Sequence, residues 1–398
     1  MTDIVELGPL RLGEPAVALD PYPWYALLRS EDPVHWSEEF QAWFVTRYED
    51  VFELLLDSRL GARVARTSFE GLSPSGRAAA LRVERFLSRW LVFADPPYHD
   101  RARRIVAGAF SPAAVTKMNG SLCKHADVAV AGFIHGGDLL AELCRPYALA
   151  VIGDVLGALP AELAELSANA RMIMDYLSSR ADTEIAERSC AAVDALTAYV
   201  GDVVLPRSRG SVAGSLARSV TKGSLTVEEA TGVFTQLLTG GIEPVSMATA
   251  VCLASVHAQQ DTLHQVRSGE LRWEDVIEEA LRYDAPFHFA PRRARMDFDF
   301  RGRRIRAGER VALVLASANR DERRFADPDR FDPVRGAQGH LAFGRGGHFC
   351  VGAALARAGS RTLLRCLDER LPTLRLQLPV SRIPAFGATV LDAVPAHV

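Results

Sequence analysis

The chain has 398 residues, of which 48% are hydrophobic and 24% are charged. This balance is ordinary for a globular protein and excludes a disordered, collagen-like or coiled-coil chain. Lys plus Arg total 46 against 49 for Asp plus Glu, so the net charge of -3 provides no overall basic field for binding nucleic acid.

The cysteines and the first residues bear on the cellular compartment. No two of the six cysteines have the close spacing of a zinc finger or a CxxC motif, and scattered cysteines in a long chain indicate a reducing cytosol. Residues 1–6 lack the basic and apolar regions of a signal peptide, and the apolar stretch 147–160 is too short to span a bilayer. The sequence therefore predicts a cytoplasmic protein with no membrane segment.

Local signals along the first two thirds of the chain predict mostly helices. Residues 20–24 open a short helix, and residues 42–47 are rich in the β-branched and aromatic side chains of a strand. Residues 95–258 are mainly helical, with caps and Gly or Pro breaks, and Ser111 followed by proline begins one of these helices.

The strongest helix signal covers residues 226–258. Thr226 and Glu229 have the spacing of a capping box. Five apolar residues then recur on one helical stripe: Ala230, Val233, Phe234, Leu237 and Leu238. An unbroken helix here has roughly 30 residues and a length of ~45–50 Å, which is enough to cross a whole domain.

A small β region follows. Residues 298–302 and 303–308 read as a hairpin, and residues 311–316 as a buried strand. Pro and Asp are dense over 321–339, as in a long ordered loop, and a final helix starts near Cys350. The fold class expected is mainly α with a small β region.

The most informative segment is Phe-Gly-Arg-Gly-Gly-His-Phe-Cys-Val-Gly at 343–352. Its four glycines permit positive φ and close backbone approach. The Ala-Ala-Leu-Ala that follows is helix-forming, so Cys350 should lie at a helix N-terminus, where the positive end of the dipole favours a thiolate. Three roles are open for Cys350: a haem ligand, a catalytic nucleophile or a structural cysteine. A zinc site is disfavoured, because His348 is the only other zinc ligand close to Cys350 in the sequence.

This segment resembles the haem-binding signature of the cytochrome P450 family, Phe-Gly-x-Gly-x-His-x-Cys-x-Gly, at every defined position, ending on Gly352. The resemblance implies the cytochrome P450 fold, with the long central helix over haem b (iron protoporphyrin IX), and a single domain over 1–398. It makes Cys350 the iron ligand, whose electron donation favours O–O cleavage. Phe343 would shield the sulfur, and His348 would bind a haem propionate.

Two further segments resemble the family. His99 and Arg103 lie one helical turn apart in Asp-Pro-Pro-Tyr-His-Asp-Arg-Ala-Arg, so both side chains can reach one anion. Arg292, six residues after Pro286, matches another propionate-binding arginine. With His348 these residues would form an anion cage around the propionates. The alternative for His99 and Arg103 is a basic surface face.

Glu279 and Arg282 have the spacing of an ion pair on one helix face. Such a pair is common by chance and usually solvated, but its position just before Asp-Ala-Pro resembles the ExxR helix of the family. The resemblance makes Arg330 the third member of a structural network.

The long helix departs from the family pattern above the haem. Gly240, Gly241 and Glu243 match the family pattern, but Pro244 occupies the position of a threonine. In the family, this threonine and the acidic residue at the Glu243 position lie in a helix bulge and help to deliver protons to bound oxygen. Proline has no N–H, so the Gly240 carbonyl loses its helical donor and is free for a water or a substrate hydroxyl. The alternatives are that Pro244 only fixes the bulge, that Glu243 forms a plain salt bridge, or that the reaction depends less on oxygen activation.

By position, the substrate wall should come from 61–93, 237–241, 286–290 and 385–389. We expect substrate contacts from Leu237, His288, Phe289 and Phe386. Phe289 offers stacking area, and His288 offers a hydrogen bond, although a satisfied core histidine is an equal alternative.

The resemblance implies a monooxygenase that oxidises a small organic substrate by O2 activation at the Cys-ligated iron, with a natural-product intermediate favoured. No flavin or iron–sulfur domain fits in the chain, so electrons would come from NAD(P)H through a ferredoxin reductase and an acidic ferredoxin, which Arg104 and Arg345 could contact. The expected protein is a monomer. The alternatives are a peroxide-driven, radical-coupling or rearranging haem-thiolate enzyme, and a non-enzymatic haem-binding sensor.

Overall fold

The computed structural model describes residues 13–62, 69–178, 182–207 and 211–398. Residues 1–6, on which the argument about a signal peptide depends, lie outside the described residues. So do residues 63–68 of the expected substrate segment 61–93.

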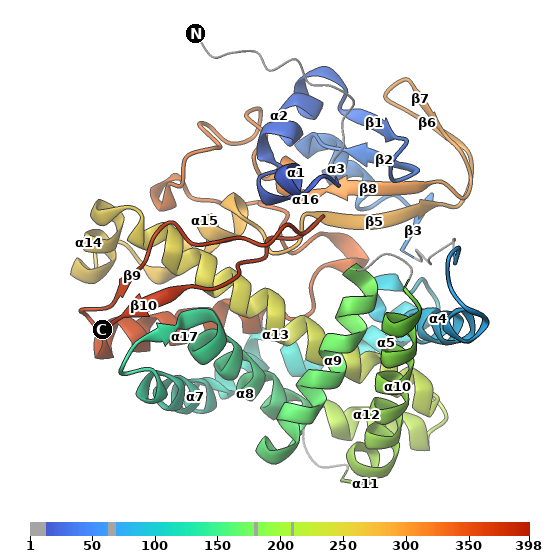
Figure 1. Ribbon diagram of the computed structural model, residues 1–398, viewed down its shortest axis with the longest axis horizontal. Helices are drawn as coiled ribbons and strands as arrows, with labels where there is room; N and C mark the ends of the chain where they lie inside the picture. The colour runs from blue at the N-terminus through green and yellow to red at the C-terminus, as the bar shows by residue number, and fades with distance from the viewer. Residues whose placement is uncertain (1–12, 63–68, 179–181, 208–210) are drawn as a thin grey trace.

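Helices make up most of the molecule, and a small β region packs along one side of them (Figure 1). The α-helices are α1 Pro15–Leu19, α2 Tyr22–Glu31, α3 Tyr48–Leu54, α4 Pro74–Leu87, α5 Tyr98–Ala107, α6 Pro112–Lys117, α7 Asn119–Gly132, α8 Arg145–Leu156, α9 Leu163–Ser178, α10 Thr183–Tyr199, α11 Leu205–Arg207, α12 Ser211–Thr221, α13 Val227–His257, α14 Gln260–Ser268, α15 Trp273–Tyr283, α16 Leu315–Ala318 and α17 Ala353–Arg370. The expected mainly α class with a small β region is confirmed.

The largest sheet has five strands in the order β1-β2-β8-β5-β3. Only β2 and β8 run parallel; the other neighbours are antiparallel. The strands are β1 Val34–Ser37, β2 Ala42–Val45, β3 Leu60–Gly61, β4 Gly137–Asp138, β5 Phe289–Ala294, β6 Phe298–Phe300, β7 Arg303–Ile305, β8 Arg310–Val314, β9 Arg375–Leu376 and β10 Pro395–His397. β6 and β7 form the expected hairpin.

One strand ends earlier than expected. The apolar run 311–316 was expected to be strand throughout, but β8 ends at Val314 and the chain turns directly into α16. The residues around this junction are all buried, and apolar periodicity alone does not separate a buried strand from a short buried helix.

Helix α13 runs through the middle of the molecule, where it packs on α8 and α15 (Figure 1). Thr226 and Glu229 form the expected capping box, with the Thr226 hydroxyl accepting from the Glu229 N–H at 3.1 Å. The helix has 31 residues, which is about 46 Å. It continues as an α-helix through Pro244, without the bulge that the resemblance implied.

By length and hydropathy, two helical segments are long and apolar enough to cross a membrane: Thr183–Arg207 and Val227–His257. The second is the central helix, and 67% of its apolar window is buried inside the fold. A buried core helix passes this test as readily as a membrane span, so the finding is weak evidence of a membrane segment.

A buried ion network joins α15 to the long loop after α16. The Arg282 guanidinium donates to both Glu279 carboxylate oxygens at 2.7 and 2.8 Å, and both side chains are fully buried. Its remaining N–H groups donate to three backbone carbonyls of the loop: Asn319, Pro328 and Arg330. We call this set the ExxR network.

The third arginine of this network is not the one expected. Arg330 contributes only its carbonyl oxygen, and its side chain is exposed. Arg335 instead donates to Glu279 Oε1 at 3.0 Å. The 3-10 turn Pro333–Arg335 directs Arg335 back to α15, and its start is also bonded to Glu279 through the Asp332 N–H.

Neutralising one member of the ExxR network should destabilise the protein strongly. We expect Glu279→Gln to lower the free energy of unfolding by about 3–5 kcal/mol, because it leaves the Arg282 charge buried without a counter-ion. Glu274→Gln on the same helix is the control: Glu274 is 42% exposed and pairs with Arg361 at 3.3 Å, so its loss should cost about 1 kcal/mol or less. Urea unfolding of the full chain measures both, and equal losses would contradict the analysis.

Candidate functional site

The glycine-rich loop before α17 presents Cys350 on a tightly bent backbone. Gly344 and Gly346 have φ of +66° and +70°, which L side chains rarely adopt. A Cβ on Gly346 would also lie 2.6 Å from Leu56 Cδ2. The Cys350 N–H donates to the Phe343 carbonyl at 2.9 Å, and α17 begins three residues later, near where the sequence predicted.

Opposing effects act on the Cys350 thiol. Surrounding protein desolvates it and raises its pKa, while the backbone N–H of Gly352 and the charges of Arg103 and Arg357 act to lower it. Burial dominates, so the pKa of Cys350 is raised and the expected preference for the thiolate is not met by the protein alone. A bound metal cation would favour the thiolate, because a coordinating thiol is deprotonated.

Arg357 is a residue of this site that sequence reasoning missed. Its guanidinium lies 4.5 Å from the centroid of the Phe343 ring and binds Glu278 of α15. Burial raises the pKa of Glu278, but hydrogen bonds from Arg357 and His340 outweigh it and bring the pKa to about 2. The available signal in the sequence was the position of Arg357, seven residues after Cys350 in the helix that follows the cysteine loop, a spacing that returns its side chain towards the loop.

The four residues of the anion cage converge from three segments. His99 and Arg103 come from α5, Arg292 from β5 and His348 from the cysteine loop. The His99 and His348 rings are 4.3 Å apart between centroids. Burial, together with the nearby charges of Arg292, His99 and Arg103, lowers the pKa of His348 to about 4 against an opposing effect of Asp95.

The cage leaves some of its buried polar groups without partners. Arg292 is 5% exposed; among the described residues its side chain bonds only the neighbouring Pro291 carbonyl, and burial lowers its pKa to about 10. His99 Nε2 is buried with no hydrogen-bond partner in the described ranges, while Nδ1 bonds Asp100 at 2.8 Å. A buried arginine and an orphaned ring nitrogen suit a carboxylate-bearing group, so these residues fit the propionates of a haem whose iron Cys350 would bind.

One stripe of α13 carries Leu237, Gly240 and Pro244, which recur at i, i+3 and i+7. A Cβ on Gly240 would meet no atom within 4 Å, so this stripe faces open space there. Gly241 has a different role from the one expected, because a Cβ there would lie 2.5 Å from Ile152 Cγ1 of α8. Gly240 leaves open space on this face of α13, whereas Gly241 lets α8 pack closely.

Glu243 forms an ion pair on the α8 side of α13. Its Oε2 accepts from Arg145 Nε at 3.1 Å, and the two side chains are 38% and 29% exposed, so the pair is accessible. Ser246, the nearest downstream hydroxyl, is buried and donates to the Ile242 carbonyl at 2.8 Å. The hydroxyl of Ser246 is therefore already committed within the helix and does not replace the missing threonine.

Phe289 and Phe386 lie together, but away from the anion cage. Side chains alternate along β5, so Phe289 is on the face opposite Arg292. Phe289 packs 5.0 Å from Phe386, which stacks on Phe40 at 4.0 Å. The expectation that Phe289 contacts substrate is therefore corrected, since the strand period places its ring against the aromatic residues of the amino-terminal region.

His288 is a satisfied core histidine, which was the alternative to a substrate contact. It is 2% exposed, its Nδ1 bonds Tyr25 Oη at 3.1 Å, and its Nε2 bonds Thr389 Oγ1 at 3.0 Å. Thr389 in turn donates to Asp284 Oδ1 at 2.6 Å, which also accepts from Tyr22 Oη at 2.9 Å. This set of side chains is the His288 network.

Known proteins resemble the chain over almost its whole length. A sequence model of the cytochrome P450 family matches residues 273–370. The chain is 32% identical to biflaviolin synthase CYP158A1 of Streptomyces coelicolor, over 86% of this chain and 83% of that protein. It is also 32% identical to the cytochrome P450 monooxygenase PikC of Streptomyces venezuelae, over 94% and 89%.

Solved structures agree with the sequence comparisons. CalO2 superposes with a TM-score of 0.87 at 27% identity, over 98% of this chain and 99% of that one. P450BioI, solved in complex with an acyl carrier protein, superposes with a TM-score of 0.86 at 25% identity, over 96% and 99%. The chain belongs to the cytochrome P450 family and has its fold. It is an oxidoreductase of the monooxygenase type, and the family implies a haem.

Burial of His288 should make stability depend on pH. Burial lowers its pKa from 6.5 to about 4, so between these values the unfolded chain binds a proton that the folded chain does not. The contribution of His288 is fully present above pH 6.5, and about 3 kcal/mol is lost as the pH falls to 4. We expect His288→Gln to flatten this part of the stability profile, measured by urea unfolding between pH 7 and 4.

The exposed His264 on α14 offers the matched control. His264→Gln should leave the slope as it is in the unsubstituted protein. The pKa of Asp284 is also lowered, from 3.8, so Asp284 titrates below the pH range of 7 to 4 that is measured. Its titration therefore does not imitate the loss of stability caused by His288. An unchanged slope in His288→Gln would contradict this interpretation.

Proposed function

We propose that the chain is a single-domain, cytoplasmic, monomeric haem-thiolate monooxygenase that oxidises a small natural-product intermediate. The observation that carries the haem assignment is the anion cage beside Cys350. A desolvated guanidinium, and a buried ring nitrogen with no hydrogen-bond partner among the described residues, are costly in a protein interior, and two propionates would offset that cost. The names of the similar proteins support the substrate class, since they include biflaviolin synthase and nocardicin C N-oxygenase.

In this proposal each group has a separate task. Cys350 holds the iron, and the haem supplies oxygen activation when bound. His99, Arg103, Arg292 and His348 hold the propionates, while Phe343 covers the sulfur, with Arg357 over its ring. Leu237, Gly240 and Pro244 border the substrate. Phe386, which is 41% exposed, remains a candidate at the edge of the substrate region.

Electrons would reach the site from NAD(P)H through a ferredoxin reductase and a ferredoxin. Phe349, beside Cys350, is 41% exposed, so the surface lies close to the sulfur. Arg104 is exposed, and Arg345 is half-buried with its guanidinium 3.4 Å from the centroid of the Phe52 ring. These cations would steer an acidic ferredoxin, and salt would weaken the contact.

For proton delivery, we propose that Glu243 is the protonatable group and that Arg145 positions it on the α8 side. Pro244 provides neither a hydroxyl nor an N–H, so the Gly240 carbonyl has no helical donor at i+4. That carbonyl borders the open space at Gly240, where it would hold a water or a substrate hydroxyl. A substrate hydroxyl bound there would take over the task of the usual threonine.

Replacing the sulfur tests the iron ligand. We expect Cys350→Ala to abolish the thiolate-type band of the ferrous carbonyl spectrum, because no other side chain of the site offers a thiolate. Cys366→Ala is the control, since Cys366 lies on the far part of α17, where its thiol bonds Asp127 at 3.5 Å. A thiolate-type band that persists in Cys350→Ala, or a colourless unsubstituted protein purified with haem available, would overturn the assignment.

Two substitutions at Pro244 separate the N–H from the hydroxyl. Pro244→Ala restores the helical donor to the Gly240 carbonyl, and Pro244→Thr adds a hydroxyl as well. The substrate for this test is found by spectral titration of a natural-product library. The measured quantity is the ratio of product to hydrogen peroxide formed per NAD(P)H, and we expect both substitutions to change it. Pro244→Ala should shift this ratio about tenfold towards hydrogen peroxide.

The pattern of the two variants is decisive. Recovery of product in Pro244→Thr but not in Pro244→Ala would mean that the hydroxyl matters, as in substrate-assisted delivery. Identical ratios in all three proteins would show that Pro244 acts on helix geometry alone. Faster product formation with hydrogen peroxide than with ferredoxin would select the peroxide-driven alternative.

A further inference from the structure

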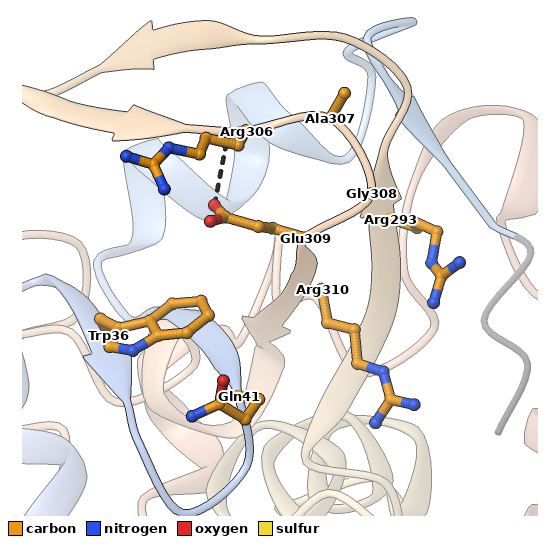
Figure 2. Close-up of a pocket in the computed structure, with 8 residues that line it drawn as sticks. All are labelled: Trp36, Gln41, Arg293, Arg306, Ala307, Gly308, Glu309 and Arg310. Carbon is orange, nitrogen blue, oxygen red and sulfur yellow. Dashed lines mark hydrogen bonds between the residues drawn. The ribbon is translucent and has the colours of Figure 1, made fainter. Parts of the chain in front are cut away.

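A shallow depression at one end of the five-stranded sheet is lined by arginines that do not converge. It has a volume of about 590 Å³ and lies where the β1–β2 hairpin meets the β7–β8 turn (Figure 2). The guanidinium groups of Arg293, Arg306 and Arg310 point in different directions there. The Glu309 carboxylate accepts from the Arg306 N–H at 2.8 Å and so holds the turn. These side chains do not form a common site for one ligand.

Charged side chains do converge beside the cysteine loop, around the carboxylate of Glu278 on α15. Arg357 of α17 donates to it twice, from Nε to Oε1 at 2.5 Å and from Nη2 to Oε2 at 2.8 Å. His340, in the segment that leads into the loop, is bonded through Nε2 to Oε2 at 3.1 Å. Glu278 therefore ties residues on both sides of Cys350 to one helix. We call Glu278, His340 and Arg357 the Glu278 clamp.

The hydrogen bonds of His340 fix the orientation of its ring. The Ala342 N–H donates to Nδ1 at 3.2 Å, so Nε2 carries the proton and donates to Glu278. The side chain of His340 is 3% exposed. A buried ring with both nitrogens bonded is held rigidly, and it holds the backbone that precedes the cysteine loop.

The Glu278 clamp borders the ring of Phe343, the residue that would cover the sulfur. The centroid of this ring lies 6.0 Å from that of His340 and 4.5 Å from the guanidinium carbon of Arg357. The attraction between a cation and an aromatic face favours the second contact. Because Glu278 binds both neighbours of the Phe343 ring, it fixes the ring through them.

The Glu278 clamp also affects the charge near Cys350. Arg103 and Arg357 both act to lower the pKa of the Cys350 thiol, which shows that their positive charges are felt at the sulfur. Glu278 is the counter-ion of Arg357. Its negative charge therefore offsets part of the effect of that arginine at the sulfur.

We propose that Glu278 is a positioning residue of the haem site, which holds Arg357 and Phe343 against the cysteine loop and keeps the reduction potential of a Cys350-bound iron low. This inference rests on the proposed haem-thiolate function. Reduction of ferric to ferrous iron takes up one electron and so adds one negative charge to the site. Arg357 favours the added charge and Glu278 opposes it, since charge and burial around a haem set its potential.

The ferric–ferrous midpoint potential of the haem-loaded full chain tests the proposal. It is measured by spectroelectrochemical titration with dithionite as the reductant, mediator dyes and a constant salt concentration. Glu278→Gln keeps the size of the side chain and removes its charge. We expect the reduction equilibrium constant to rise about tenfold, which is ~59 mV for one electron. Arg357→Gln removes the cation and should lower the potential.

A second ion pair between the same two helices provides the matched control. Arg361 lies one turn after Arg357 on α17, and Glu274 lies one turn before Glu278 on α15. The two charges are 3.3 Å apart, and their side chains are 35% and 42% exposed. This pair is farther along α17 from the cysteine loop, so Glu274→Gln and Arg361→Gln should change the equilibrium constant by about twofold at most.

The direction of the shifts separates tuning of the potential from structural support alone. Loss of support would move the potential in the same direction in Glu278→Gln and Arg357→Gln, whereas the proposal requires opposite directions. It is overturned if the two shifts have the same sign, if either variant keeps the original potential, or if the control variants shift it equally. Where Glu278→Gln does not retain haem, Arg357→Gln compared with Arg361→Gln decides.

The ferrous carbonyl spectrum distinguishes failure of this inference from failure of the proposed function. A thiolate-type band in the unsubstituted protein, with no shift of potential in Glu278→Gln, refutes the role of Glu278 alone. Absence of that band from the unsubstituted protein refutes the haem-thiolate assignment and the role of Glu278 with it.

Discussion

The organisation of the site follows from one constraint: a buried arginine, and an imidazole nitrogen with no hydrogen-bond partner among the described residues, lie in the same site as a cysteine. Arg292 and His99 come from segments far apart in the sequence, yet the fold removes both from solvent, and the half-buried His348 packs against His99. A protein interior tolerates such an arrangement when an anion completes it. The depressed pKa values of Arg292 and His348 express the cost that the haem propionates would offset.

The two adjacent glycines of the central helix have different surroundings. Gly240 borders open space, whereas Gly241 lies against Ile152 of α8. Pro244 is accommodated without interrupting the helix. Pro244 therefore changes hydrogen bonding, since it has neither a hydroxyl nor an N–H, rather than the path of the backbone.

Much of the architecture was predictable because its signals are local. The capping box at Thr226 and the bend of the cysteine loop depend on residues a few positions apart. The signals failed where long-range packing decides. Neither the use of Arg335 in place of Arg330 nor the pairing of Glu243 with Arg145, 98 residues away, has any local signature. The position of Phe289 was predictable from the sequence. Phe289 and Arg292 are three residues apart on one strand, so alternation places their side chains on opposite faces of the sheet.

The His288 network joins the two ends of the chain. Tyr22 and Tyr25, near the start, are bonded to a cluster that Thr389 completes. During synthesis the first helices therefore leave the ribosome long before their buried partners exist, and these contacts can form only after Thr389 has been made. Such distant closure slows folding and exposes aromatic surface in the meantime. Until then, the aromatic side chains of the amino-terminal region lack the partners that bury them.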